Sequence, residues 1–307
     1  MKAIVCTEYG PPSVLQLDER IKPEPKKNEI CIKVVASAVT TSDSRVRGFQ
    51  FPLTNPMILM FRLILGISRP RNPVLGMVMS GVVESVGRNV SKFKPGDEVY
   101  GMTGPGFGSY AEYNCVSENG CFVHKPEHLS HEDAAAITYG GLLASDCLQR
   151  GKINSGNKVL IYGASGAIGS SAVQLAKASG AHVVAVCSGK NRELVSSLGA
   201  DEVWDYTSQE TVPEGQTFDL VFDAVGDNKT SALKRACRLA VSPKGKYISV
   251  DKGMLKSEVT ALRHINRLLA RGEFRAVIDK TFPLEQIVAA HEYVDLGHKR
   301  GNVVVVV

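Results

Sequence analysis

Three glycines, Gly163, Gly166 and Gly169, are spaced so that the backbone around them could hold the pyrophosphate of a dinucleotide. They follow the apolar run 158–162, which is typical of a buried strand, and they precede a segment with the periodicity of an amphipathic helix. Glycine permits a tight turn and lets backbone N–H groups approach a phosphate at the positive end of a helix. The spacing G-x-x-G-x-x-G is less specific than G-x-G-x-x-G, but the strand and the helix around it support the interpretation. The predicted contacts of this turn are Gly163, Ala164, Ser165, Gly166, Ala167, Ile168 and Gly169.

The end of the next predicted strand, 182–187, indicates which dinucleotide binds. The five residues after it, 188–192, are SGKNR, without the Asp or Glu that accepts a hydrogen bond from the ribose 2′-OH in an NAD site. A hydroxyl group and cations suit a 2′-phosphate, so we predict NADPH as the cofactor. The alternative is that Lys190 and Arg192 only face solvent on the first turn of a helix. The predicted contacts at the strand ends are Ser188, Lys190, Tyr206, Val225 and Gly226.

The composition indicates a folded protein of one large or two medium domains. The chain has 307 residues, of which 44% are hydrophobic, enough for proper cores. Its net charge of +5 is spread along the chain, so we predict no nucleic-acid partner. Its seven cysteines are scattered and include no C-x-x-C, which argues for a reducing compartment and against a disulfide framework or a zinc ribbon. Residues 1–10 lack the apolar core of a signal peptide, and we expect a cytoplasmic protein.

Hydrophobic patterning divides the chain into two kinds of region. Before the glycine turn, predicted strands at 2–6, 29–35, 81–86, 98–102 and 110–116 are separated by Gly and Pro clusters, as in an all-β module. After it, strands and helices alternate at 182–187, 192–198, 202–206, 220–224, 230–240 and 247–250, which predicts a parallel sheet covered on both faces. Helical periodicity returns at 259–270 and 284–296, and the chain ends in a predicted strand, 303–307.

The last strand is expected to return to the first module, which would make that module discontinuous. We therefore predict a β-rich domain formed by residues 1–122 with 275–307, and a nucleotide-binding domain formed by residues 123–274. The predicted fold class is α/β.

Six short motifs, in order along the chain, resemble those of the medium-chain dehydrogenase/reductase superfamily. Besides the Gly163 turn they are GVVESVG at 81–87, KPGDEV at 94–99, GSYAEY at 108–113, LGADEV at 198–203, and the pair FPL at 282–284 and HKRG at 298–301. The resemblance implies a β-rich N-terminal domain like the chaperonin-10 fold, a Rossmann domain, and substrate held in the cleft between them. One segment, between Val250 and Val259, is shorter than the resemblance leads us to expect. The predicted partners include a second copy of the chain as a homodimer, although the resemblance implies a longer segment here for the usual dimer contact.

Three positions decide which branch of the superfamily the chain resembles. Thr40, Met77 and Tyr139 stand where, or close to where, the zinc alcohol dehydrogenases carry their three catalytic zinc ligands. None of these side chains suits Zn²⁺, which takes thiolate, imidazole or carboxylate ligands. A run of four closely spaced cysteines for a structural zinc is also missing. The resemblance therefore points to the zinc-independent, quinone-oxidoreductase-like branch, which implies NADPH-dependent reduction of quinones or of C=C bonds conjugated to a carbonyl, with no metal ligands.

The resemblance also implies which side chains face the nicotinamide: Thr40, Ser42 and Tyr139. Tyr139 is the predicted donor to the oxygen of the reduced acceptor, because a tyrosine with a pKa of about 10 is protonated at neutral pH. The alternative is that Tyr139 only walls the pocket and water supplies the proton. We interpret Asp43 as an acceptor for backbone N–H groups of its own turn. We also interpret His124, His128 and His131 as residues before a helix capped by Ser130 rather than a metal site. Cys115 and Cys121 are interpreted as buried or loop cysteines, with a redox role as the alternative.

The longest apolar segment, residues 56–67, has the sequence PMILMFRLILGI. Arg62 interrupts it, and it is too short to span a bilayer, so we predict no membrane span. Because methionines adapt to varied apolar shapes, we predict a hydrophobic lid or wall and an apolar substrate. The alternative is a helix packed in the core. For the whole chain, the alternatives to a quinone or enone reductase are a non-catalytic NADPH-binding redox sensor and, less well supported, an alcohol dehydrogenase.

Overall fold

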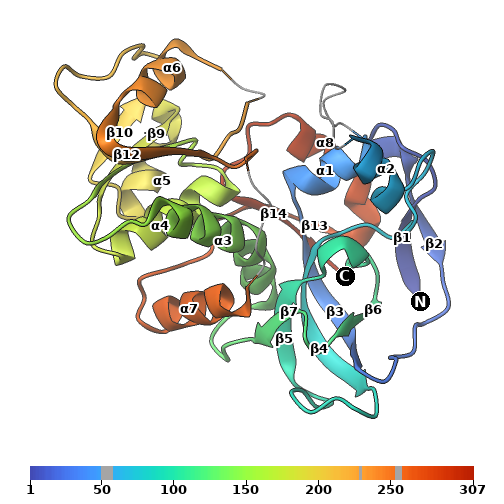
Figure 1. The fold of residues 1–307 in the computed structure, drawn as a ribbon. Coiled ribbons are helices and arrows are strands. Elements are labelled where there is room, and N and C mark those ends of the chain that lie inside the picture. Colours follow the sequence, from blue (N-terminus) through green and yellow to red (C-terminus); the bar gives the residue numbers. More distant parts are fainter. Residues whose placement is uncertain (50–57, 228–229, 253–257) are drawn as a thin grey trace. The chain divides into compact units, whose positions relative to one another are not determined.

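The computed structural model describes residues 1–49, 58–227, 230–252 and 258–307 (Figure 1). The chain divides into two compact units, the first formed by Met1–Tyr139 with Ile278–Val307 and the second by Gly140–Val277. This division describes compactness, and the predicted domain bounds, 1–122 with 275–307 and 123–274, stay a prediction.

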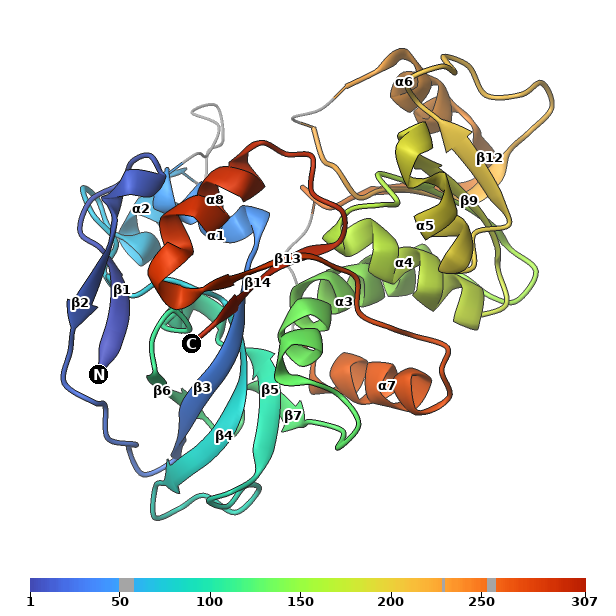
Figure 2. The ribbon, with the colours of Figure 1, turned by 180° about the vertical axis from the view of Figure 1, so that it is seen from behind.

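The first unit is built on a seven-stranded sheet in which the order is β13-β14-β3-β4-β5-β7, with β6 paired to β3. The strands are β3 (Glu29–Val39), β4 (Val78–Val86), β5 (Glu98–Met102), β6 (Tyr113–Ser117), β7 (Cys121–His124), β13 (Ile278–Pro283) and β14 (Asn302–Val306). The last strand, β14, pairs antiparallel with β3, and Val303 stands opposite Val39 (Figure 2). The prediction that the C-terminal strand returns to the first module is therefore confirmed.

Short helices cover one side of this unit. The α-helices of this unit are α1 (Thr41–Arg47), α2 (Ile58–Leu65) and α8 (Ile287–Asp295). The unit also contains a two-stranded ribbon of β1 (Lys2–Cys6) and β2 (Leu15–Glu19). Short 3-10 helices are present at Pro12–Val14, Gly104–Gly106 and Leu284–Gln286. An apolar core containing Ile4, Val46, Ile287 and Val303 joins β1, α1, α8 and β14. A separate core beneath β3, β4 and β7 contains Ile30, Ile32, Met79 and Phe122.

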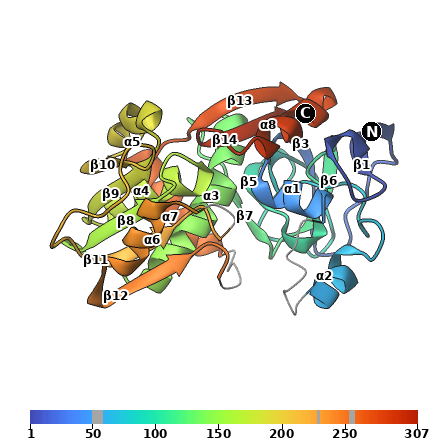
Figure 3. The same ribbon diagram turned by 90° about the horizontal axis from the view of Figure 1, so that it is seen from above.

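The second unit is built on a five-stranded parallel sheet, β10-β9-β8-β11-β12, which can be followed in this order in Figure 3. The strands are β8 (Lys158–Tyr162), β9 (His182–Cys187), β10 (Glu202–Asp205), β11 (Phe218–Asp223) and β12 (Val241–Ser249). Chain order places the first strand in the middle, two strands on one side and two on the other, so the winding reverses between β8 and β11. That is the Rossmann arrangement, and the predicted fold class is confirmed.

Five helices connect or flank these strands: α3 (His131–Gly151), α4 (Ala167–Ala178), α5 (Arg192–Ser197), α6 (Ala232–Leu239) and α7 (Val259–Ala270), with a 3-10 turn at Gly189–Asn191. The Asp133 backbone N–H donates to Ser130 Oγ at 3.0 Å, which confirms Ser130 as the cap of α3. No described helix is both long and apolar enough to cross a bilayer.

The differences from the predicted elements lie mainly in half-exposed strands. β2, β7 and β13 were not predicted. β2 buries only Leu15 and β13 buries none of its residues, so their apolar alternation is weak, whereas β7 is buried at three positions but is only four residues long. The strand predicted at 110–116 begins only at Tyr113, because Tyr110 instead bonds through its backbone to Leu75 and Ile4. β12 begins at Val241, whereas the prediction began at Tyr247. The first half of the strand is polar and partly exposed, so it lacks the apolar pattern of a buried strand.

Candidate active site

The glycine turn after β8 is packed so closely that two of its three glycines admit no side chain. Gly163 has a φ of +81°, and a Cβ there would lie 2.5 Å from Val225 Cγ2. A Cβ on Gly169 would lie 2.1 Å from the carbonyl oxygen of Gly163, which is backbone and cannot move aside alone. At Gly166, by contrast, the only described atom within 4 Å of an added Cβ would be Gly163 O at 3.6 Å. The turn is thus closely packed at its first and last glycines and has free space beside Gly166.

The open side of the turn is the N-terminus of α4. Gly166 is the N-cap residue, and as a glycine it has no side chain that could cap the helix. The first backbone N–H groups of a helix have no partner within the helix, and they lie at the positive end of its dipole. This arrangement fits the pyrophosphate of a dinucleotide, which accepts hydrogen bonds and is negatively charged.

The ends of the neighbouring strands meet this turn at one edge of the sheet. Asn191, in the 3-10 turn after β9, donates from Nδ2 to Ser165 Oγ at 3.0 Å, which ties the β9 end to the glycine turn. Lys190 is exposed beside it. Tyr206 follows β10, is 40% exposed, and its ring lies 6.2 Å from that of Tyr162 at the end of β8. The structure therefore gathers the predicted phosphate contacts along one edge.

One carboxylate at this edge was missed by the sequence reasoning. Asp205, the last residue of β10, stands opposite Cys187, and a Cβ on Gly189 would lie 2.3 Å from its Oδ2. Thr207 donates to Asp205 Oδ1 from Oγ1 at 2.7 Å and from its backbone N–H at 2.9 Å, and the hydroxyl bond is the main cause that lowers the Asp205 pKa. The sequence contained a signal for this residue: the strands predicted at 182–187 and 202–206 were expected to be parallel, and the C-terminal ends of parallel strands share one edge of the sheet.

A buried ion pair shapes the end of β11, where the cofactor contacts Val225 and Gly226 were predicted. Asp223 Oδ1 accepts from the backbone N–H groups of Val225 at 3.1 Å and Gly226 at 3.2 Å. Its Oδ2 lies 2.9 Å from Lys234 Nζ and accepts from the Tyr247 hydroxyl at 2.8 Å. Lys234 also donates to Gly226 O at 2.5 Å. The turn at 225–226 is therefore fixed from both sides, beside the point where the strand order reverses.

In the first unit, three polar residues singled out in the sequence lie at the N-terminus of α1: Thr40, Ser42 and Asp43. Thr40 is the N-cap: its Oγ1 donates to Asp43 Oδ2 at 2.6 Å and accepts from the Asp43 backbone N–H at 3.2 Å. The Thr40 backbone N–H donates to Asp43 Oδ2 at 2.8 Å, so the interpretation of Asp43 as an acceptor in its own turn is confirmed. Burial raises the pKa of Asp43 to about 6 against these hydrogen bonds.

Ser42, in the first turn of α1, contacts Tyr139. The two hydroxyl oxygens are 2.5 Å apart, and either can be the donor. Tyr139 is 9% exposed and is the last residue of the first unit in sequence before Gly140. Gly140 belongs to the second unit, where a Cβ on it would lie 2.3 Å from Ala167 O, so α3 comes close to the first turn of α4 at that residue. The structure thus unites two of the three predicted catalytic hydroxyls, while the Thr40 hydroxyl is engaged in the helix cap.

Behind α1, buried polar side chains link α1 to α8. The Arg47 guanidinium is 1% exposed, donates to Asp295 Oδ2 at 2.7 Å and lies 3.0 Å from His291 Nδ1. Because a guanidinium only donates, Nδ1 accepts and the imidazole proton is on Nε2. Burial, followed by the charge of Arg47, lowers the pKa of His291 to about 3. The imidazole is therefore neutral at physiological pH.

Comparison with known proteins places the chain in a family. Residues 26–127 match the family model described as alcohol dehydrogenase GroES-like domain, and residues 167–276 match zinc-binding dehydrogenase. The chloroplastic NADPH-dependent alkenal/one oxidoreductase of Arabidopsis thaliana is 32% identical over 99% of this chain and 79% of its own length. This chain belongs to the quinone-oxidoreductase-like medium-chain dehydrogenases/reductases. The predicted family is therefore confirmed.

Two further members of the family are similar over nearly the whole chain. The mitochondrial NAD(P)H oxidoreductase RTN4IP1 of Bos taurus is 34% identical over 99% of this chain and 89% of its own length. The solved quinone oxidoreductase of Coxiella burnetii has a TM-score of 0.83 and 28% identity, and the match covers 100% of this chain and 99% of that one.

One of the two matching family models is named for zinc binding, but the three positions predicted to replace the zinc ligands are Thr40, Met77 and Tyr139. Thr40 is engaged in the cap of α1, Tyr139 contacts Ser42, and Met77 packs partly buried against the core of β1, α1 and β14. Across residues 1–49, 58–227, 230–252 and 258–307, no three His, Cys, Asp or Glu side chains are grouped so that they could hold a metal ion. The donor set at these positions does not fit zinc.

The three histidines near the N-terminus of α3 do not converge, and His131 is the first residue of that helix. His131 lies with Nδ1 2.7 Å from Ser80 Oγ and Nε2 3.2 Å from Glu98 Oε1. His124 faces Asp97 at 3.2 Å, and His128 is exposed. Each of the two paired imidazoles contacts its own carboxylate, as expected for structural residues.

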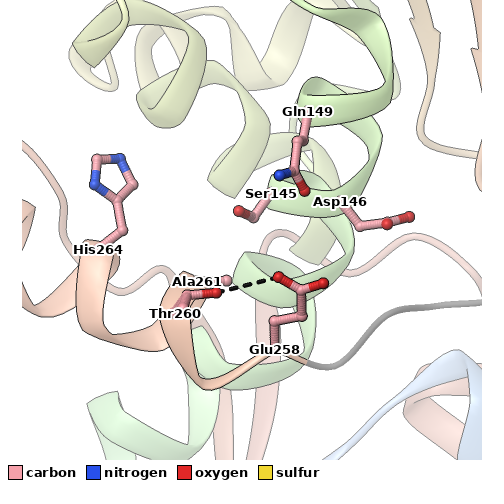
Figure 4. Close-up of a pocket in the computed structure, with 7 residues that line it drawn as sticks. All are labelled: Ser145, Asp146, Gln149, Glu258, Thr260, Ala261 and His264. Carbon is pink, nitrogen blue, oxygen red and sulfur yellow. Dashed lines mark hydrogen bonds between the residues drawn. The ribbon is translucent and has the colours of Figure 1, made fainter.

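A pocket of about 250 Å³ lies between α3 and α7 in the second unit (Figure 4). It is lined by Ser145, Asp146, Gln149, Glu258, Thr260, Ala261 and His264. Thr260 Oγ1 donates to Glu258 Oε2 at 3.2 Å, and Asp146 pairs with Arg150 at 3.1 Å. None of the predicted site residues is among the described residues that line it.

Two predictions fall partly or wholly outside the described residues. The short segment between Val250 and Val259 includes residues 253–257, which are not described. Of the predicted lid, 56–67, residues 56 and 57 and the side chains of 58–61 are not described. The described part, in α2 and just after it, leaves Leu63 53%, Ile64 49% and Ile67 66% exposed. This end of the segment therefore lies at the surface rather than in the core.

Proposed function

We propose that this chain transfers a hydride from NADPH to a quinone or an α,β-unsaturated carbonyl compound without a metal ion. The predicted oxidoreductase class and NADPH cofactor are confirmed by the relatives, among them the NADPH-dependent alkenal/one oxidoreductase. The observation that carries the proposal is the edge of the parallel sheet, where a glycine turn, an uncapped helix N-terminus and an exposed lysine lie together.

In this proposal the cofactor is held mainly by backbone. The turn from Gly163 to Gly169, through Ala164, Ser165, Gly166, Ala167 and Ile168, contacts the pyrophosphate. Ser188, Lys190 and Tyr206 bind the 2′-phosphate, and Val225 and Gly226 contact the cofactor at the β11 end. A charge-assisted hydrogen bond from Lys190 favours the phosphate over a hydroxyl group. Asp205 accepts a hydrogen bond from Thr207 and lies against Gly189.

The hydroxyl pair Ser42 and Tyr139 supplies the proton in this proposal. When bound, NADPH supplies the hydride, and negative charge then develops on the oxygen of the acceptor. Tyr139 donates to that oxygen, while Ser42, 2.5 Å away, donates to the tyrosine oxygen and stabilises the charge left there. Thr40 contributes by starting α1, which places Ser42.

Independence from zinc is supported by the donor set described above. Thr40, Met77 and Tyr139 offer a hydroxyl, a thioether and a phenol, and the two hydroxyls already have hydrogen-bond partners within the first unit. A thioether is a poor ligand for Zn²⁺, which takes thiolate, imidazole or carboxylate. The charge on the acceptor oxygen is therefore assigned to hydrogen-bond donors rather than to a metal ion.

The preference for apolar acceptors is supported by α2. Leu63 and Ile64 expose about half of their side-chain surface, and Ile67 just beyond them exposes 66%. Exposed aliphatic side chains at neighbouring positions are typical of a surface that binds an apolar partner or ligand. We propose that this segment contacts the substrate.

Cytoplasmic location and a homodimer are also proposed. All seven cysteines are free, which suits a reducing compartment. Because relatives carry chloroplastic and mitochondrial names, subcellular fractionation of the tagged chain is the direct test. Size-exclusion chromatography with light scattering tests the dimer.

The central test mixes the purified chain and NADPH with matched pairs of large and small quinones and enones. We expect NADPH oxidation, faster with the apolar acceptors, and unchanged after dialysis against a zinc chelator. Tight NADPH binding without oxidation of any acceptor would favour the non-catalytic sensor. Stoichiometric zinc with chelator-sensitive oxidation of alcohols would favour an alcohol dehydrogenase.

A further inference from the structure

Two cysteines face each other directly across two strands of the first unit. In the pairing of β3 with β6, Cys31 stands opposite Cys115, between the pairs Ile30 with Val116 and Ile32 with Asn114. Directly opposed residues of antiparallel strands have Cα atoms about 4.5 to 5.5 Å apart. Disulfides form at Cα separations of about 4.4 to 6.8 Å. The backbone is therefore already spaced for a bond between the two sulfurs.

The pair lies on the sheet face opposite the apolar core. Ile30 and Ile32 belong to the core beneath β3, so Cys31 between them points to the other face. Cys31 is buried there and donates from Sγ to the carbonyl of Pro23 at 3.7 Å, within the irregular segment 20–26. Cys115 is half-buried. One short irregular segment thus covers Cys31, and half-buried Cys115 beside it marks the side from which a small peroxide would reach the Cys31 sulfur.

The surroundings of Cys31 stabilise a thiolate. The pKa of Cys31 is lowered, mainly by a hydrogen bond from Cys115 and then by the charge of Lys22 and the Ser85 hydroxyl, while its burial and the charge of Glu84 act in the opposite direction. Lys22 is held beside the pair, with Nζ 2.6 Å from Glu84 Oε1 and 4.0 Å from the centroid of the Tyr113 ring on β6. Cys121 on β7 provides the contrast, because burial raises its pKa to about 11.

We propose that Cys31 and Cys115 form an oxidation site in which a hydroperoxide converts the two thiols into a cross-strand disulfide. The Cys31 thiolate attacks the peroxide, an S–O bond forms, the O–O bond breaks, and the leaving oxygen takes up a proton. Cys115 then attacks the Cys31 sulfenic acid, the S–S bond forms, and the S–O bond breaks with loss of water. Two thiols and one hydrogen peroxide yield one disulfide and two water molecules, and a dithiol reductant reverses the change.

Peptide mapping after mild oxidation tests the proposal on the intact chain. The reduced protein is treated with hydrogen peroxide, blocked with N-ethylmaleimide and digested without reductant by trypsin and Glu-C, which releases residues 30–33 and 113–118, each with one cysteine. We expect these two peptides to be joined with the loss of two hydrogen atoms, and the link to vanish after dithiothreitol. Disulfides only between other cysteines, only between chains, or none at all would overturn the proposal.

Variants separate this pair from general oxidation. Cys121→Ser should keep the link, while Cys31→Ser and Cys115→Ser should lose it. The link closes a long loop, so we also expect oxidation to raise Tm by about 5 °C or more in the wild type and in Cys121→Ser. An equal rise in Cys115→Ser would contradict the assignment. If a serine variant fails to fold, the wild-type peptide map and its reversal by reductant still decide.

Discussion

Replacing Gly169 by alanine tests the closest contact in the proposed cofactor site. The added methyl carbon would lie 2.1 Å from Gly163 O and 2.7 Å from Ala164 Cα. Both are backbone atoms, so the start of α4 must move away from the end of β8. Overpacking of this kind costs about 1 to 3 kcal/mol. The shift also displaces the first N–H groups of α4, and loss of well-aligned hydrogen bonds to a phosphate should raise the Kd for NADPH by about 5- to 150-fold.

Gly166→Ala is the matched control, because the same methyl group is added three residues earlier in the same turn. Its nearest described contact would be Gly163 O at 3.6 Å, an ordinary van der Waals distance. We expect a change in unfolding free energy within about 0.5 kcal/mol. The methyl group still occupies the open side of the turn where the pyrophosphate is proposed to lie, so NADPH binding should weaken at nearly constant stability.

The assay measures Tm by differential scanning fluorimetry without cofactor, and the Kd for NADPH by isothermal titration calorimetry. Gly169→Ala should lower Tm by about 2 to 4 °C for each kcal/mol and weaken binding, while Gly166→Ala should weaken binding alone. Wild-type Tm in Gly169→Ala would show that the turn is not packed as described. Wild-type Kd values in both variants would show that the pyrophosphate does not bind at this turn.

Three further predictions concern other parts of the molecule. Lys190→Ala should weaken NADPH binding by about 1 to 3 kcal/mol and leave NADH binding nearly unchanged, with Arg192→Ala as the control, whereas equal losses for both cofactors in calorimetric titrations would remove the 2′-phosphate assignment. Tyr139→Phe should lower kcat by about 100-fold or more at an unchanged Kd for NADPH, and a wild-type kcat in stopped-flow and steady-state assays would make water the proton source. Burial lowers the pKa of His291 to about 3 in the folded chain. Between that pH and the ordinary histidine pKa, the imidazole takes up a proton only in the unfolded chain, so the free energy of unfolding decreases as pH falls. From pH 7 to 5 this loss is about 2 kcal/mol, and urea unfolding of His291→Gln should show a pH dependence smaller by that amount; identical slopes would refute the buried neutral imidazole.

The glycine turn could be predicted from sequence because its geometry is local. Gly163 needs a positive φ, and Gly169 needs room beside a carbonyl only six residues away. A strand before the turn and a helix after it are sufficient context, and both were recognisable from apolar periodicity. The same reasoning found the strand end at Ser188, because its position depends only on the length of β9.

Residues that shape the site through pairing of distant segments could not be found in this way. Asp205 reaches Gly189 only because β10 lies beside β9, and Lys234 reaches Gly226 because α6 returns to the end of β11. A lone Asp or Lys in a sequence is most often a solvated surface residue. Their roles follow from the order of the strands in the sheet. The alternation of strands and helices predicts a parallel sheet, but it does not predict which residues of neighbouring strands contact each other.

Hydrogen bonding also divides the proposed site into a part that depends on backbone and a part that depends on side chains. At the proposed pyrophosphate site the main donors are backbone N–H groups, which most substitutions leave in place, so damage there requires a clash such as the one at Gly169. Proton donation depends instead on the two hydroxyls of Ser42 and Tyr139, which a single atom change removes. Binding of the pyrophosphate should therefore tolerate most side-chain changes outside the glycines, and turnover should not tolerate the loss of either hydroxyl. A chain that keeps the glycine turn and loses the tyrosine hydroxyl would be the NADPH-binding protein without turnover that the sequence alone left open.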